Sequence, residues 1–108
     1  MIEIIIDKAS AIKIIKELTK NYDEQYTKIQ ISKTLLEISE IKEVMGATVF
    51  NNEANKRGWL LFVDPILFAN WSHKCEYYFI ISETEVISNT NCNWPPTDSI
   101  EIELITNI

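Results

Sequence analysis

The chain has 108 residues, 46% of them apolar, with only 2 glycines and 3 prolines. This is the size and content of one domain, residues 1–108, with one hydrophobic core and no long disordered linker. No stretch approaches the roughly 18 consecutive apolar residues of a membrane-spanning helix, and the start lacks the basic leader of a secretory signal. The composition therefore predicts a cytoplasmic protein.

The net charge of −6 is unevenly distributed, since residues 1–50 contribute −1 and residues 51–108 contribute −5. A field of this sign repels phosphate backbones and anionic lipids, which disfavours nucleic acid and membrane surfaces as partners. It attracts a basic protein. An acidic surface also keeps a small protein soluble without any partner, and charge alone leaves both explanations open.

Residues 1–6 are mostly β-branched and predict a short strand or an extended lead-in. The period then changes, because apolar side chains recur at helical spacing while lysines and Glu17 lie off their stripe. The stripe consists of Ala11, Ile14, Ile15, Leu18 and Tyr22. Asp7 or Ser10 can cap such a helix, and Asn21 can end it. The pattern predicts an amphipathic helix that needs a sheet or a second helix to cover its apolar side.

Residues 32–45 fit two patterns. The alternation around Leu36 to Ser39 fits a strand, whereas a longer stripe has helical spacing. That stripe runs through Ile31, Leu35, Ile38, Ile41 and Met45. The spacing favours the helix slightly, and the strand stays open until Gly46 breaks the pattern.

The stretch from residue 47 to residue 63 predicts a hairpin. Residues 47–50 have the composition of a strand, and the polar residues 51–58 connect them to residues 59–63. The second strand is apolar on both faces, with Trp59, Leu61 and Val63 on one side and Leu60 and Phe62 on the other. A strand that is apolar on both faces belongs in the middle of a sheet.

A second hairpin is predicted around a turn at residues 82–85. Pairing outward from this turn places Ile80 opposite Ile87 and Cys75 opposite Cys92. The face expected to be buried carries Cys75, Tyr77, Phe79, Ile81, Val86, Cys92 and Trp94, and the other face carries Glu76, Tyr78, Ile80, Asn89 and Asn91. The turn sequence is not a preferred one, so a register shifted by one residue stays open, and it would separate the cysteines.

Pro95 and Pro96 end that strand, because proline cannot donate to a ladder. Residues 99–105 then alternate, with Ile100, Ile102 and Leu104 on one side and Glu101 and Glu103 on the other. This predicts a half-buried strand whose acidic outer face would also protect a sheet edge. Together the elements predict an α+β fold, in which an N-terminal amphipathic helix packs on an antiparallel β-sheet of about four to five strands.

The residues best suited to chemistry form no complete catalytic or metal motif. Asp64, His73, Cys75 and Cys92 lack the paired spacing of a zinc site. A Cys–His hydrolase would need Cys75 as its nucleophile, and this cysteine lies in a stretch with a buried pattern. Two glycines in the whole chain exclude a phosphate-cradling loop. We therefore expect no enzyme activity, no metal and no cofactor.

Two further patterns have plain structural explanations. The opposed cysteines can close a disulfide, but a reducing cytoplasm favours two buried thiols. The paired acids Glu101 and Glu103 are more typical of a solvated strand face than of an acid–base pair.

Trp71, which stands among small polar residues, is either a lid over the end of the core or an exposed anchor of a protein interface.

Three features together suggest a family. They are the N-terminal amphipathic helix, the Gly58-Trp59-x-x-Phe62 strand followed by a loop, and an antiparallel meander that ends near Trp94-Pro95-Pro96. Over residues 9–105 this arrangement resembles the small immunity proteins encoded beside bacterial polymorphic and contact-dependent toxins. The resemblance implies a cytoplasmic, non-enzymatic inhibitor that binds a toxin domain and blocks its active site or an essential surface. It does not identify the toxin.

On this interpretation the partner is a basic toxin domain, and the binding residues lie in the loop after the central strand and on the acidic C-terminal strand. They are Asp64, Asn70, Trp71, His73, Glu101 and Glu103. Two alternatives stay open: an inhibitor of a host or phage enzyme outside any toxin system, and a small hydrolase that uses Cys75. The sequence leaves the oligomeric state undecided.

Overall fold

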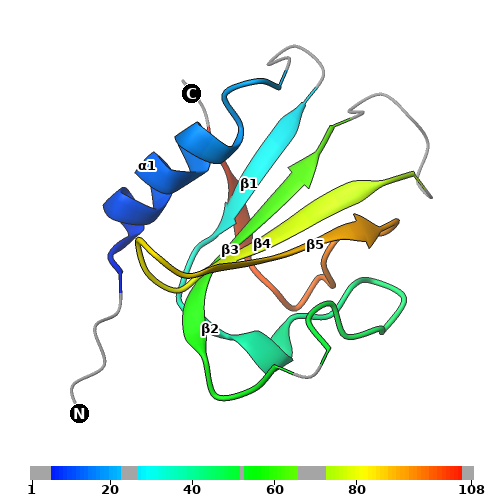
Figure 1. The fold of residues 1–108 in the computed structure, drawn as a ribbon. Coiled ribbons are helices and arrows are strands. Elements are labelled where there is room, and N and C mark those ends of the chain that lie inside the picture. The colour runs from blue at the N-terminus through cyan, green and yellow to red at the C-terminus, as the bar shows by residue number, and fades with distance from the viewer. Residues whose placement is uncertain (1–5, 23–26, 52, 66–72, 106–108) are drawn as a thin grey trace.

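The computed structural model describes residues 6–22, 27–51, 53–65 and 73–105. The expected α+β class is confirmed, because a helix packs on an antiparallel sheet (Figure 1). The elements are α1 (Lys8–Leu18), β1 (Lys28–Ser32), β2 (Leu36–Glu37), the 3-10 helix η1 (Ile38–Glu40), β3 (Arg57–Asp64), β4 (Cys75–Ile80), β5 (Val86–Cys92) and β6 (Ile102–Leu104). None of the helices in these ranges is long and apolar enough to cross a membrane.

The sheet has the strand order β5-β4-β3-β1-β6, and the short β2 pairs with the start of β3. All of these pairings are antiparallel. β3 lies in the middle of the sheet, as its two apolar faces predict, and every residue from Gly58 to Asp64 is buried. The sheet therefore has a core on each of its sides, and β3 contributes to both.

The predicted amphipathic helix is confirmed as α1. Asp7 caps it by accepting a hydrogen bond from the backbone N–H of Ser10 at 2.7 Å. Ala11 and Ile15 are fully buried, and α1 lies across one face of the sheet (Figure 1). There they join a cluster formed with Ile6, Ile29, Ile31, Trp59, Leu61, Val63 and Ile80. The helix ends at Leu18, so Tyr22 packs on this cluster from the segment that follows.

The opposite face of the sheet is covered by η1 and the irregular chain that follows it. This second cluster contains Ile38, Ile41, Val49, Phe50, Leu60, Phe62, Cys75, Tyr77, Phe79 and Ile100. The predicted strand at residues 47–50 is wrong, because only an isolated bridge between Lys42 and Thr48 forms there. Its hairpin with residues 59–63 is wrong as well, since β3 pairs with β1, β2 and β4.

The way in which the apolar residues between 32 and 50 pack explains why the predicted strand at residues 47–50 does not form. For residues 32–45 the slightly favoured α-helix is wrong, and the strand alternative holds only at Leu36–Glu37, which is followed by one turn of 3-10 helix. Its isoleucines cover the far side of β3 and β4 as individual contacts. A segment that only has to place side chains on a core needs no fixed period, so its spacing is a poor guide to its backbone.

The β4–β5 register is partly as predicted. The body of the hairpin is shifted by one residue, so that Ile80 is paired with Val86 and Phe79 with Ile87. An irregularity between Cys75 and Tyr77 then restores the expected pairing of Cys75 with Cys92. A β-bulge inserts one residue into one strand, which is why the shift does not separate the cysteines.

The shift moves the side chains of the paired part of β5 to the face opposite the one predicted, and Val86, Ile87 and Asn89 are examples. Val86 packs on the helix-side cluster. Asn89, paired with Tyr77, donates to the carbonyl oxygen of Val49 on the other side at 2.7 Å.

Candidate functional site

Asp64 and His73 form a buried pair at the end of the central strand. Asp64 is the last residue of β3, and His73 stands two residues before β4. Their side chains are 6% and 11% exposed, and His73 Nε2 lies 2.7 Å from Asp64 Oδ1. The pair thus joins the two ends of the chain segment that connects β3 to β4.

The backbone explains why these two residues meet. β3 and β4 are antiparallel neighbours, with Val63 paired with Glu76. Continuing that register brings the residues just beyond each strand end close together. The geometry places Asp64 and His73 side by side. Asn70 and Trp71, predicted to belong to the same surface, lie outside the residues that the structure describes.

The two acids predicted on the C-terminal strand lie elsewhere. Glu103 forms an ion pair with Lys8 at the start of α1, and Glu101 is exposed. Ile31 of β1 is paired with Leu61 of β3 on one side and with Glu103 of β6 on the other. Glu103 therefore lies two strands away from β3, at the level of Leu61, which is three residues before Asp64. At ordinary strand spacings that is about 10 Å along the sheet and about 10 Å across it. The predicted residues therefore form at least two separate patches.

The cysteines are two free thiols. Cys75 is completely buried, and its Sγ donates to the carbonyl oxygen of Trp94 at 3.3 Å. Burial, and to a lesser degree the neighbouring Cys92 and Asp64, raises the pKa of Cys75 to about 12. The thiolate is the reactive form of cysteine, so this position is poorly suited to a nucleophile at neutral pH.

We expect Cys75 to resist alkylation in the folded protein. At a pKa of about 12, only about one thiol in ten thousand is ionised at pH 8, compared with about one in four for an unperturbed cysteine. Labelling with iodoacetamide at pH 8, followed by peptide mass spectrometry, should show Cys75 reacting at least about a thousandfold more slowly than it does in urea. Equal rates in the folded and unfolded protein would contradict this placement. Cys92, which is half-buried, serves as the internal comparison.

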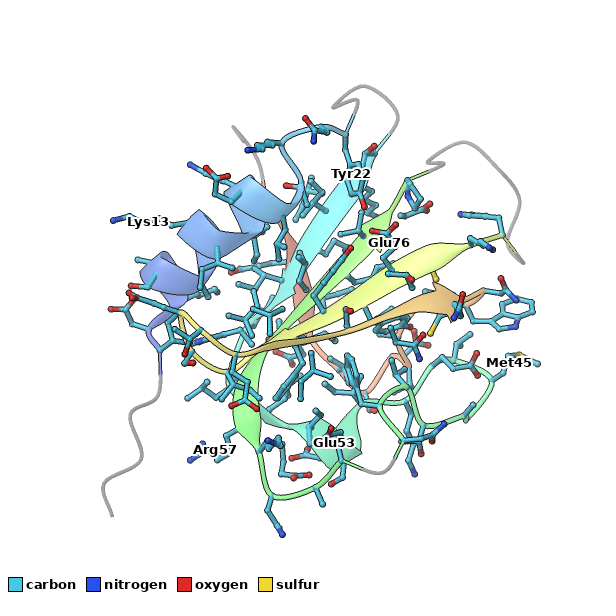
Figure 2. All side chains as sticks on the ribbon, viewed as in Figure 1. Lys13, Tyr22, Met45, Glu53, Arg57 and Glu76 are labelled. Carbon is cyan, nitrogen blue, oxygen red and sulfur yellow. The ribbon has the colours of Figure 1, made fainter. Side chains whose placement is uncertain are left out.

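The sequence patterns missed a cluster on the helix side of the sheet. Tyr22 and Tyr78 both donate to Glu76 Oε1, Tyr78 at 2.8 Å and Tyr22 in a shorter contact. Figure 2 shows Tyr22 and Glu76 pointing toward one another at the end of the sheet beyond the helix. The alternation of β4 placed Glu76 and Tyr78 on one face, but no spacing signal links them to Tyr22.

A second feature is an exposed apolar tip at Val44 and Met45, which are 45% and 68% exposed. The tip is held by backbone hydrogen bonds from Gly46 N to Glu43 O and from Val44 N to Pro95 O, both 2.8 Å. Such apolar side chains on a fixed turn are suited to a protein contact.

A shallow hollow of about 480 Å³ lies between α1 and the β4–β5 turn, lined by Ser10, Lys13, Ile14, Glu17, Leu18 and Glu83.

Within the described ranges, no three His, Cys, Asp or Glu side chains are placed to hold a metal ion together. Comparisons of the chain with protein-family models, with curated proteins and with solved structures found no match.

Proposed function

We propose that this chain is a cytoplasmic, non-enzymatic inhibitor that binds and neutralises a basic domain of a bacterial toxin, in the manner of an immunity protein. The observation that carries the proposal is the buried Asp64–His73 pair. It fixes the base of the segment in which the sequence places Asn70 and Trp71. A segment whose two ends are already held together has less conformational freedom to lose on binding, which supports an interface anchor in it.

The charge supports a basic partner. Residues 51–108, which contain β3 to β6, carry the net charge of −5. Opposite charge on a partner raises the rate of encounter and discriminates against acidic competitors. On this proposal Asp64 and His73 position the contact, Asn70 and Trp71 make it, and Glu101 contributes steering from the neighbouring edge. Glu103 has a weaker claim because Lys8 already neutralises it.

An inhibitor of a host or phage enzyme would use the same surface, and the gene adjacent to this one distinguishes the two cases. A hydrolase that uses Cys75 is the less favoured alternative, because its thiol is buried and its pKa is raised to about 12. A Cys75→Ser variant should keep full protective activity. Loss of protection by a well-folded Cys75→Ser protein would favour the hydrolase.

We expect Trp71→Ala combined with Glu101→Lys to abolish protection of cells that express the toxin. Truncating a buried interface tryptophan costs about 2–4 kcal/mol of binding, or at least a thirtyfold rise in Kd, and the charge reversal slows encounter. The readout is the survival of cells that co-express the toxin and each variant. Trp71→Ala with Glu17→Lys is the matched control, since Glu17 is exposed on α1 and the change in net charge is the same. If the Glu101 variant protects cells like the unchanged protein, these residues do not bind the toxin.

A further inference from the structure

Glu76 lies at the start of β4, on the face of the sheet that α1 partly covers. Its neighbour on the same face, two residues along the strand, is Tyr78. Tyr22 reaches it from the segment after the end of α1, as Figure 2 shows. All three side chains are partly exposed, so the cluster lies at the surface and is not a sealed core network.

Among the described residues, Glu76 accepts hydrogen bonds at only one of its two carboxylate oxygens. Both tyrosine hydroxyls donate to Oε1. In the part of the chain that the structure describes, every buried side-chain nitrogen or oxygen has a partner, so the unpaired Oε2 is open to solvent. No lysine, arginine or histidine of the described ranges forms an ion pair with this carboxylate. The result is a carboxylate whose Oε1 is held by two tyrosine hydroxyls and whose Oε2 is left for a further donor.

Tyr22 and Tyr78 can donate to this carboxylate throughout the physiological pH range. Burial first, and then the hydrogen bond to Glu76, raises the pKa of Tyr22 above its usual value, and the same two causes raise the pKa of Tyr78. Both therefore stay protonated donors across the physiological range. A guanidinium group fits what remains, because it is planar, donates in a fork, is weakly hydrated and stacks on aromatic rings. An ammonium group is more strongly hydrated and does not stack.

We propose that Tyr22, Glu76 and Tyr78 form a recognition site for one arginine side chain of a protein partner. The guanidinium donates to Glu76 Oε2 and lies against a tyrosine ring. The identity of that partner as a toxin rests on the proposed function, but the chemistry of the site does not. Val63 is paired with Glu76 and precedes Asp64, so this site and the Asp64–His73 pair lie at the same end of the sheet, on opposite faces. A partner that covers this end reaches both.

The test uses the isolated full-length protein and three short peptides, acetyl-Gly-Gly-Xaa-Gly-Gly-amide, with arginine, lysine or the neutral analogue citrulline at the centre. Titrations followed by amide chemical shifts in NMR locate the contact and give Kd. We expect the arginine peptide to shift the amides of residues 76–78 and the region of Tyr22, and to bind about tenfold more tightly than the citrulline peptide. Mapping on the unchanged protein keeps the test valid even if a variant fails to fold.

Glu76→Gln should weaken the arginine peptide about tenfold, because the amide keeps an acceptor for the tyrosines but removes the charge. Glu83→Gln is the matched control, since Glu83 is exposed in the β4–β5 turn and the change in net charge is identical. Equal affinity for lysine and arginine, or equal weakening by both variants, overturns the proposal, as do shifts confined to other surfaces. Because no toxin takes part, this result is independent of whether the proposed function holds.

Discussion

A Gly58→Ala variant is expected to lose about 3 kcal/mol of its free energy of unfolding, a large share of the total for a domain of this size. Gly58 is buried in β3, where a Cβ atom would lie 2.4 Å from the carbonyl oxygen of Ile80 and 3.0 Å from its carbonyl carbon. Both of these atoms belong to the backbone of β4, so one of two central strands has to move. Urea denaturation measures the loss as a lower midpoint at unchanged slope.

Gly46 provides the matched control for this experiment. Its φ angle is +97°, which an alanine adopts only under strain, but a Cβ atom there has no neighbour within 4 Å. We expect Gly46→Ala to cost about 1 kcal/mol, from backbone strain alone. A smaller loss in Gly58→Ala than in Gly46→Ala would mean that β3 and β4 do not approach as closely as the fold requires.

The second large effect is expected at the Asp64–His73 pair, which joins the end of β3 to the residues before β4. Asp64→Ala should lower the free energy of unfolding by about 3 kcal/mol, because it removes a buried carboxylate that lies 2.7 Å from His73. Asp64→Asn keeps the volume and one acceptor, so it should cost less. Both variants are compared by urea denaturation at one pH.

A double-mutant cycle separates the pair from its surroundings. We expect Asp64→Ala and His73→Ala to be coupled by about 2 kcal/mol, since a hydrogen bond to a charged group contributes about 1.5–3 kcal/mol. Losses that simply add would show that the two side chains do not act together. In that case the segment between them would lack the fixed base on which the proposed function depends.

The parts of the fold that were predictable are those with a strict period and a buried face. α1 could be recognised because its apolar residues recur at helical spacing, with Ala11 and Ile15 buried against the sheet, and because Asp7 caps it. β3 was recognisable as central because both of its faces are apolar. β1 was missed, because only Ile29 and Ile31 mark a strand of five residues whose other side chains are polar. Two apolar positions are too few to distinguish a strand from a loop.

The β4–β5 register shows a different limit. The pairing of Cys75 with Cys92 was predicted, yet the rest of the hairpin is shifted by one residue. A sequence pattern sets which residues share a face, but the position of a bulge depends on how the backbones fit together. Val86 therefore packs on the helix side, although alternation alone places it with Cys75.

The candidate site was predictable only where it is local in the chain. Asp64 and His73 flank one short segment, and the structure brings them together. The grouping of Asp64 with Glu101 was not supported, because the strand order puts β1 between β3 and β6. The Tyr22–Glu76–Tyr78 cluster was out of reach for the same reason. Only the tertiary fold brings Tyr22 next to Glu76 and Tyr78 of β4.

The proposed function of this protein is to bind and neutralise a toxin domain. The most direct test is calorimetric titration of the purified chain into the purified domain encoded by the adjacent gene, with the toxic activity measured on the same samples. We expect a one-to-one complex with a Kd below about 1 µM and loss of that activity at the equivalence point. Absence of binding at tens of µM, or a complex that leaves the toxic activity intact, would contradict the claim.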